Sequence, residues 1–197
     1  FVRVDLTSQP LKPVGRETKQ RYFPEVGGKN SDRARDLAIY YANRLLPNGA
    51  CAIYVPKKIS IQPLFQRLDD LLHREADLPN LKSSASEEAL EKVSNLVRLH
   101  YGNDSVLSSG ISAGVLPHYG DLQGAIRQSV EFTLEHGLAK CIACTSTLAE
   151  GVNLPIKYLI VTGVRRGNET PRTRDFQNLI GRTARSGKYS EGSILVA

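Results

Sequence analysis

Two stretches near the C-terminal end decide the fold: TSTLAEGVNLP at residues 145–155 and QNLIGRTARSG at residues 177–187. The first follows an apolar run, which predicts the end of a strand and a turn. The second predicts a helix. At about 100° per residue, Asn178, Arg182 and Arg185 share one face of that helix, and Gln177 and Gly181 lie beside it. Apolar side chains occupy the opposite face, so two guanidinium groups project from an anchored helix. Their planar forks suit the oxygens of a phosphate.

An ordinary amphipathic helix with two solvated arginines is the alternative for the second stretch taken alone. The two stretches together favour a functional interpretation, because they resemble motifs V and VI of superfamily 2 helicases (the DEAD/DEAH-box-related proteins) in order and spacing. The pattern Ser-Thr-Leu-Ala-x-Gly-Val-Asn-Leu-Pro is most similar to the Ski2-like branch, which includes the Hel308 type. The resemblance covers about residues 51–197 and implies the C-terminal RecA-like domain of such a protein.

The rest of the chain alternates between apolar runs and amphipathic segments, which predicts parallel strands joined by helices. We therefore expect an α/β, RecA-like three-layer domain, with a mostly parallel sheet, helices on both faces and a helical insertion at about residues 60–114. Within it, residues 78–86 are expected to be a polar connection and residues 103–114 a Ser/Gly-rich loop. Asp121 is expected to cap a helix that ends near residue 136. Strands are expected at 51–56, 115–120, 139–144, 157–163 and 192–196, and helices at 31–46, 60–76, 86–102 and 121–136.

The N-terminal thirty residues differ from the rest, since prolines interrupt them and alternation is confined to the first six. We expect residues 1–30 to be a linker with short strands, and residues 31–197 to be the helicase C-terminal domain. The chain begins with Phe1 and ends on an apolar run, so we interpret it as a piece of a longer protein.

Composition restricts the function only weakly. The 197 residues contain 26 Lys and Arg against 20 Asp and Glu, a net charge of +6, which permits a polyanionic partner without requiring one. The three cysteines lie in apolar runs, which predicts buried thiols and a reducing compartment: cytoplasm, nucleoid or nucleus. Cys141 and Cys144 have a CxxC spacing, but no second ligand pair completes a metal site. No long apolar span predicts a membrane segment.

Polar residues follow several predicted strands, at the edge where ligands of parallel sheets collect. Lys57 and Lys58 follow the first predicted strand of the domain, and Thr145 and Ser146 follow the third. Helicase resemblance implies that such residues hold the backbone of single-stranded DNA or RNA. A solvated lysine pair and a structural histidine are the alternatives. The residues expected to bind nucleic acid are Lys57, Lys58, Thr145, Ser146, His118 and Gly120.

The same resemblance implies how ATP is contacted. Arg182 and Arg185 would be catalytic, as arginine fingers on the triphosphate, and Gln177 would lie near the same phosphate. Gly151, Asn153 and Gly181 would line the ATP site. ATP and Mg²⁺ would be held mainly by an upstream RecA-like domain, because this chain has neither a Walker A loop nor a Walker B carboxylate pair.

The expected function is therefore the second motor domain of an ATP-dependent DNA or RNA helicase, inactive as an isolated piece. Its partners would be single-stranded nucleic acid and the upstream domain of the same protein. Two alternatives stay open: a translocase that does not separate strands, and a non-catalytic RecA-like binding module.

Overall fold

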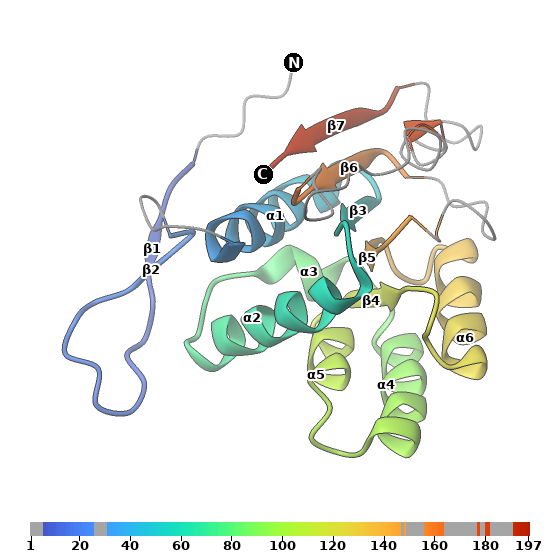
Figure 1. The fold of residues 1–197 in the computed structure, drawn as a ribbon, viewed down its shortest axis with the longest axis horizontal. Coiled ribbons are helices and arrows are strands. Elements are labelled where there is room, and N and C mark those ends of the chain that lie inside the picture. The colour runs from blue at the N-terminus through green and yellow to red at the C-terminus, as the bar shows by residue number, and fades with distance from the viewer. Residues whose placement is uncertain are drawn as a thin grey trace.

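A computed structural model describes residues 6–25, 31–146, 148, 156–163, 177, 180–181 and 191–197. Its centre is a parallel sheet of five strands in the order β4-β5-β3-β6-β7 (Figure 1). Every residue of β3, β4, β5 and β6 is buried, as expected for strands that are covered on both faces. The strands are β3 (Cys51–Tyr54), β4 (Val115–His118), β5 (Cys141–Cys144), β6 (Tyr158–Val161) and β7 (Ser193–Val196).

Helices connect β3 to β4 and β4 to β5 and pack on the sheet, which confirms the predicted α/β, RecA-like fold class. The α1 helix contacts β3 and β6, whereas α5 and α6 contact β4. Ser86 caps α4 as its sequence suggests, by accepting a hydrogen bond from the Ala89 backbone N–H at 3.4 Å. The helices are α1 (Ser31–Leu45), α2 (Ile61–His73), α3 (Pro79–Ser83), α4 (Glu87–Tyr101), α5 (Val106–Ser112) and α6 (Gly124–Glu135), with short 3₁₀ turns at Leu46–Asn48 and Lys58–Ser60.

Two segments expected to lack regular structure contain helices. The α3 helix lies within the expected polar connection, and α5 lies within the expected Ser/Gly-rich loop. Packing explains the second error: Leu107 and Ile111 are buried, and Gly110 admits the ring of Phe65. A Cβ at Gly110 would lie 2.2 Å from Phe65 Cδ1. Tertiary contacts thus override the low helix propensity of serine and glycine.

The predicted cap of α6 is also wrong. The helix begins at Gly124, and the Gln123 side chain accepts a hydrogen bond from the Ile126 N–H at 3.1 Å. Asp121 lies outside the helix, and its carboxylate pairs with Lys58 instead.

The N-terminal segment is joined closely to the domain. It forms the antiparallel strands β1 (Gln9–Pro10) and β2 (Tyr22–Phe23), while Leu11 and Phe23 are buried in the core. Residues 1–5 lie outside the described residues, so the alternation expected there is not described. The domain boundary near residue 30 stays a prediction.

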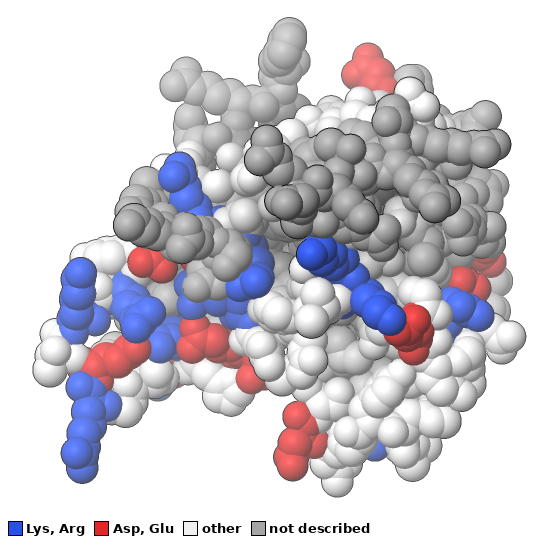
Figure 2. All heavy atoms as spheres, in the orientation of Figure 1, with Lys and Arg blue, Asp and Glu red and all other residues white. Residues whose placement is uncertain are grey.

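Ion pairs join this segment to the end of α2, and α2 to α1. Arg74 donates to both carboxylate oxygens of Glu17, at 2.7 and 2.9 Å, and to Asp70 at 2.7 Å. Arg67 donates to both oxygens of Asp36, at 2.7 and 2.9 Å, and also to Asp70. The hydrogen bond from Arg74 lowers the pKa of Glu17 to about 2. Figure 2 shows charges of both signs interleaved where the N-terminal hairpin lies, at the left of the view.

The three cysteines are free and buried, and burial raises the pKa of each thiol. Within the described ranges, no three His, Cys, Asp or Glu side chains lie together as metal ligands would. In the same part of the chain, no helix is both long and apolar enough to span a membrane.

Gly114 offers a test of how tightly α3 packs on the turn before β4. Its φ is +98°, and an added Cβ would lie 2.1 Å from the Leu81 carbonyl oxygen. Gly102 has a similar φ of +91° but open space around it. We expect Gly114→Ala to lower the free energy of unfolding by about 1–3 kcal/mol more than Gly102→Ala does. Urea unfolding of both variants measures the difference, and equal losses would show that α3 does not pack as described.

Candidate functional site

The carboxyl ends of the strands form one straight edge of the sheet. Tyr54, the last residue of β3, is in register with Cys144 of β5 and with Val161 of β6. His118, which ends β4, is also in register with Cys144. The segments that follow β4, β5 and β3 therefore emerge side by side (Figure 1). This edge, which we call the carboxyl edge, brings together Lys57, Lys58, Gly120, Thr145 and Ser146.

Thr145 and Ser146 lie at the middle of these three segments, directly after β5. The Thr145 backbone N–H donates to the His118 carbonyl at 3.2 Å, and its carbonyl accepts from the Leu148 N–H at 3.2 Å. Thr145 is 6% exposed, whereas Ser146 is half-buried. The backbone of this turn is thus held from both sides, and the Ser146 residue reaches the surface.

The two lysines differ in their surroundings. Lys57 is half-buried before the 3₁₀ turn that follows β3, whereas the Lys58 side chain is 65% exposed. Lys58 forms an ion pair with Asp121 from the segment after β4. Because β5 lies between β3 and β4 in the sheet, this ion pair crosses the carboxyl end of β5. The ion pair therefore links the two segments that lie on either side of the segment after β5.

His118 does not lie on the surface of the carboxyl edge. It is 3% exposed, and its Nε2 lies 2.8 Å from Oε1 of Glu131 on α6. Its Nδ1 is buried and has no hydrogen-bond partner in the described part of the chain. This position suits a structural histidine and does not suit direct contact with a strand. Gly120 is exposed two residues further on.

The predicted arginine helix is described only in part. The Gly181 N–H donates to the Gln177 carbonyl at 2.8 Å, the spacing of one helical turn. Gln177 and Gly181 are exposed, and Ile180 is half-buried against the core, as the periodicity predicts. The remaining ATP-contacting candidates lie outside the described residues: Gly151, Asn153, Arg182 and Arg185.

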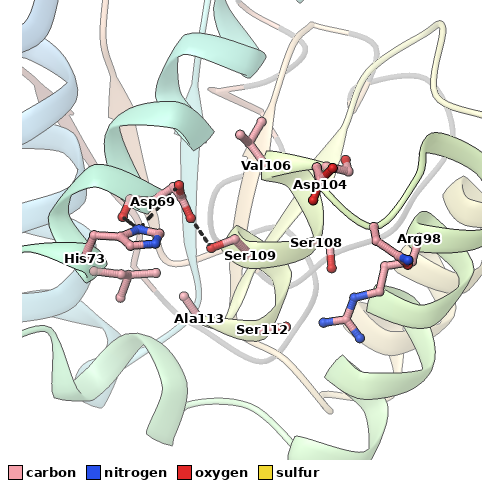
Figure 3. A pocket seen from close by; sticks show the side chains of 12 residues that line it. Asp69, His73, Arg98, Asp104, Val106, Ser108, Ser109, Ser112 and Ala113 are labelled. Carbon is pink, nitrogen blue, oxygen red and sulfur yellow. Dashed lines mark hydrogen bonds and ion pairs between the residues drawn. The ribbon is translucent and has the colours of Figure 1, made fainter.

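A polar hollow between α2, α4 and α5 lies apart from these candidates (Figure 3). Ser109 donates a hydrogen bond to Asp69 at 2.5 Å, and His73 Nδ1 lies 3.5 Å from the same carboxylate. The serine and the histidine both contact the aspartate, so the histidine is not placed as a base for the serine. These three residues do not form a hydrolytic triad.

Sequence reasoning missed the role of Asp121, which it interpreted as a helix cap. The ion pair joins residues 63 positions apart. A carboxylate next to a turn glycine carries no local signal of such a pairing.

Residues 65–187 match the helicase conserved C-terminal domain family. The chain therefore belongs to that family, and it is a C-terminal domain of the superfamily 2 helicase type. It is 30% identical to Hachiman protein HamB of Bacillus cereus over 199 residues, covering 98% of this chain and 17% of that protein.

Two further relatives have helicase names. The chain is 29% identical to human Helicase POLQ-like over 163 residues, covering 82% of this chain and 14% of that protein. It is 27% identical to the ATP-dependent DNA helicase Hel308 of Methanocella arvoryzae over 165 residues, covering 79% of this chain and 21% of the relative. The chain thus spans about a fifth or less of these relatives.

Proposed function

We propose that this chain is the second RecA-like motor domain of an ATP-dependent nucleic-acid helicase. The observation that carries the proposal is the carboxyl edge, where the segments after three neighbouring parallel strands bring polar and basic residues together. Membership of the helicase C-terminal family supports it, as does the name of the Methanocella relative.

In this proposal, the carboxyl edge holds the sugar-phosphate backbone of a single strand. Lys57 supplies positive charge, and Ser146 supplies a hydroxyl donor from the turn that Thr145 anchors to β4. Such groups read no base sequence, because every nucleotide presents the same phosphate. Binding at this edge is therefore salt-dependent and tolerant of sequence.

ATP would lie between this domain and an upstream RecA-like domain of the same protein. The upstream domain would hold most of the nucleotide and Mg²⁺. Arg182 and Arg185 would approach the triphosphate, with Gln177 and Gly181 beside it on the same helix. Gly151 and Asn153 would complete the near side of the site. An arginine supplied from a second domain stabilises the charge that develops on the transferred phosphoryl group.

Lys57→Ala tests the grip on the backbone. We expect weaker binding of single-stranded oligonucleotides and a fall of about 0.7 in the slope of log K against log salt, the loss of one phosphate contact. Lys92→Ala is the matched control, because Lys92 is exposed on α4 and pairs with Glu88. Salt titrations of the full-length protein by fluorescence anisotropy measure both slopes. Equal slopes for the two variants would contradict the assignment.

Asp121→Asn provides the complementary variant in the same titration. It removes the partner of Lys58 without removing a positive charge from the carboxyl edge. Because exposed ion pairs contribute only about 0–1 kcal/mol, binding should tighten by no more than about fivefold. Weaker binding would mean that the Asp121 carboxylate itself contributes to binding of the single-stranded nucleic acid.

A further inference from the structure

A second hollow borders the carboxyl edge and differs in character from the one in Figure 3. Its cavity volume is about 580 Å³, and it lies between the start of α2, the end of α4, the start of α5 and the segment after β4. Lys58 stands on its rim and at the same time belongs to the candidate strand-binding surface. The hollow is therefore continuous with that surface.

The lining of this hollow is largely apolar and aromatic. Ile61 and Leu107 are buried and form its floor, at 2% and 8% exposure. Tyr101 and Ile59 line it as well, yet they are 44% and 74% exposed. Large apolar side chains that are held open to solvent beside a cavity are typical of a binding site.

The two tyrosines of the hollow are held in place. The Tyr101 hydroxyl accepts a hydrogen bond from the Gln123 backbone N–H at 3.2 Å. Burial, with Tyr101 as its neighbour, raises the pKa of Tyr119 to about 12, so the Tyr119 hydroxyl stays a neutral donor at physiological pH. Rings that are fixed before a ligand arrives lose little conformational entropy when it binds.

The hollow of Figure 3 lacks these properties. Asp104, Ser105 and Val106 line both hollows and so form the ridge between them. On the far side of that ridge the lining carries His73, Arg98 and a row of serines, with no aromatic ring from a tyrosine (Figure 3). Of the two hollows described, only the one next to Lys58 has the aromatic and apolar lining that suits a flat, partly apolar ligand.

We propose that this hollow, the base pocket, receives one nucleobase of the strand whose backbone lies along the carboxyl edge. The inference rests on the proposed function and deepens it. One nucleotide carries both a phosphate, which suits Lys58 at the rim, and a flat base, which suits the aromatic lining. Stacking on Tyr101, the more exposed of the two rings, accepts any base, because every base has a π-face. Gln62, Asp104 and Ser105 on the lining can hydrogen-bond to base edges.

The experiment measures binding of a twenty-nucleotide dT strand and its rU counterpart to the full-length protein. Tyr101→Ala is expected to weaken binding about 5- to 100-fold, the effect of losing one stacked base. The salt slope should stay unchanged, because no phosphate contact is lost. Tyr101→Phe keeps the ring and should bind nearly as tightly as the native protein. Leu99→Ala is the matched control, since Leu99 is 82% exposed on the same helix and does not line the pocket.

A single abasic residue, moved along the strand, then locates the base. At one position, the abasic residue should weaken binding of the strand by the native protein. On that strand, the native protein and Tyr101→Ala should bind equally tightly. If Tyr101→Ala binds like Leu99→Ala, the base pocket is wrong, and the hollow is free for a protein partner. If the loss persists at every abasic position, Tyr101 acts without a stacked base and the pocket is also wrong.

The salt titration separates this failure from failure of the proposed function. If Lys57→Ala reduces the slope while Tyr101→Ala has no effect, only the base pocket is overturned. If neither variant changes binding, the carboxyl edge does not hold the strand, and both proposals fall.

Discussion

Replacing Arg185 by alanine in the full-length protein is expected to lower the rate of ATP hydrolysis by about 10³-fold or more. In the proposed function, this arginine approaches the triphosphate from a helix whose neighbouring positions, Gln177 and Gly181, face solvent. Its charge matters most when negative charge develops on the transferred phosphoryl group. The loss should therefore appear mainly in kcat, with ATP binding largely retained. Steady-state hydrolysis at saturating ATP and single-stranded nucleic acid measures it.

Arg98→Ala is the matched control for that variant. Arg98 is an exposed arginine on α4 whose side chain donates to Asn95 at 3.0 Å, away from the carboxyl edge. Its removal should leave hydrolysis near the native rate. If Arg185→Ala hydrolyses ATP as fast as Arg98→Ala does, Arg185 is not a finger, and the non-catalytic binding module becomes the better interpretation.

Arg67→Ala is expected to have the largest effect on stability, with a loss of about 3–5 kcal/mol in the free energy of unfolding. Asp36 is 0% exposed, and Arg67 covers both of its carboxylate oxygens. Without the guanidinium, a buried carboxylate keeps only the Glu25 backbone N–H at 3.0 Å as its partner among the contacts described. Urea unfolding of the 197-residue chain measures the loss.

A second substitution identifies the cause of that loss. Asp36→Asn, added to Arg67→Ala, removes the buried charge and keeps an oxygen for the Glu25 N–H. The double variant should therefore be more stable than Arg67→Ala alone. A double variant that is less stable would indicate lost packing of the arginine, and not an unpaired charge, as the source of the effect.

The strands could be predicted because each is a short apolar run with polar residues at its ends. In β3 and β5, four consecutive residues are buried. A short run of consecutive apolar residues in the sequence is typical of such a strand, which is covered on both faces of a parallel sheet. The same reasoning placed Thr145 and Lys57 at the carboxyl edge, since the carboxyl ends of parallel strands lie on one side of a sheet. Helix α4 could be predicted because Ser86 marks its beginning.

Other features depend on contacts that the local sequence does not contain. Helix α5 forms because Leu107 and Ile111 are buried and Gly110 fits against Phe65, although its serines favour a loop. The Lys58–Asp121 pair depends on the order of the strands in the sheet, and the meeting of Tyr101 with Tyr119 depends on how α4 packs beside the segment after β4. Sequence periodicity gives the inward face of a helix, but it does not give the partner that the outward face meets.

The most direct test of the central claim is the rate of ATP hydrolysis by the full-length native protein, with and without saturating single-stranded DNA or RNA. A motor domain that couples ATP to a strand on the carboxyl edge predicts a rate that rises about tenfold or more, ~1.4 kcal/mol in the barrier, with at least one of the two nucleic acids. The same hydrolysis rate with and without both nucleic acids would contradict the account.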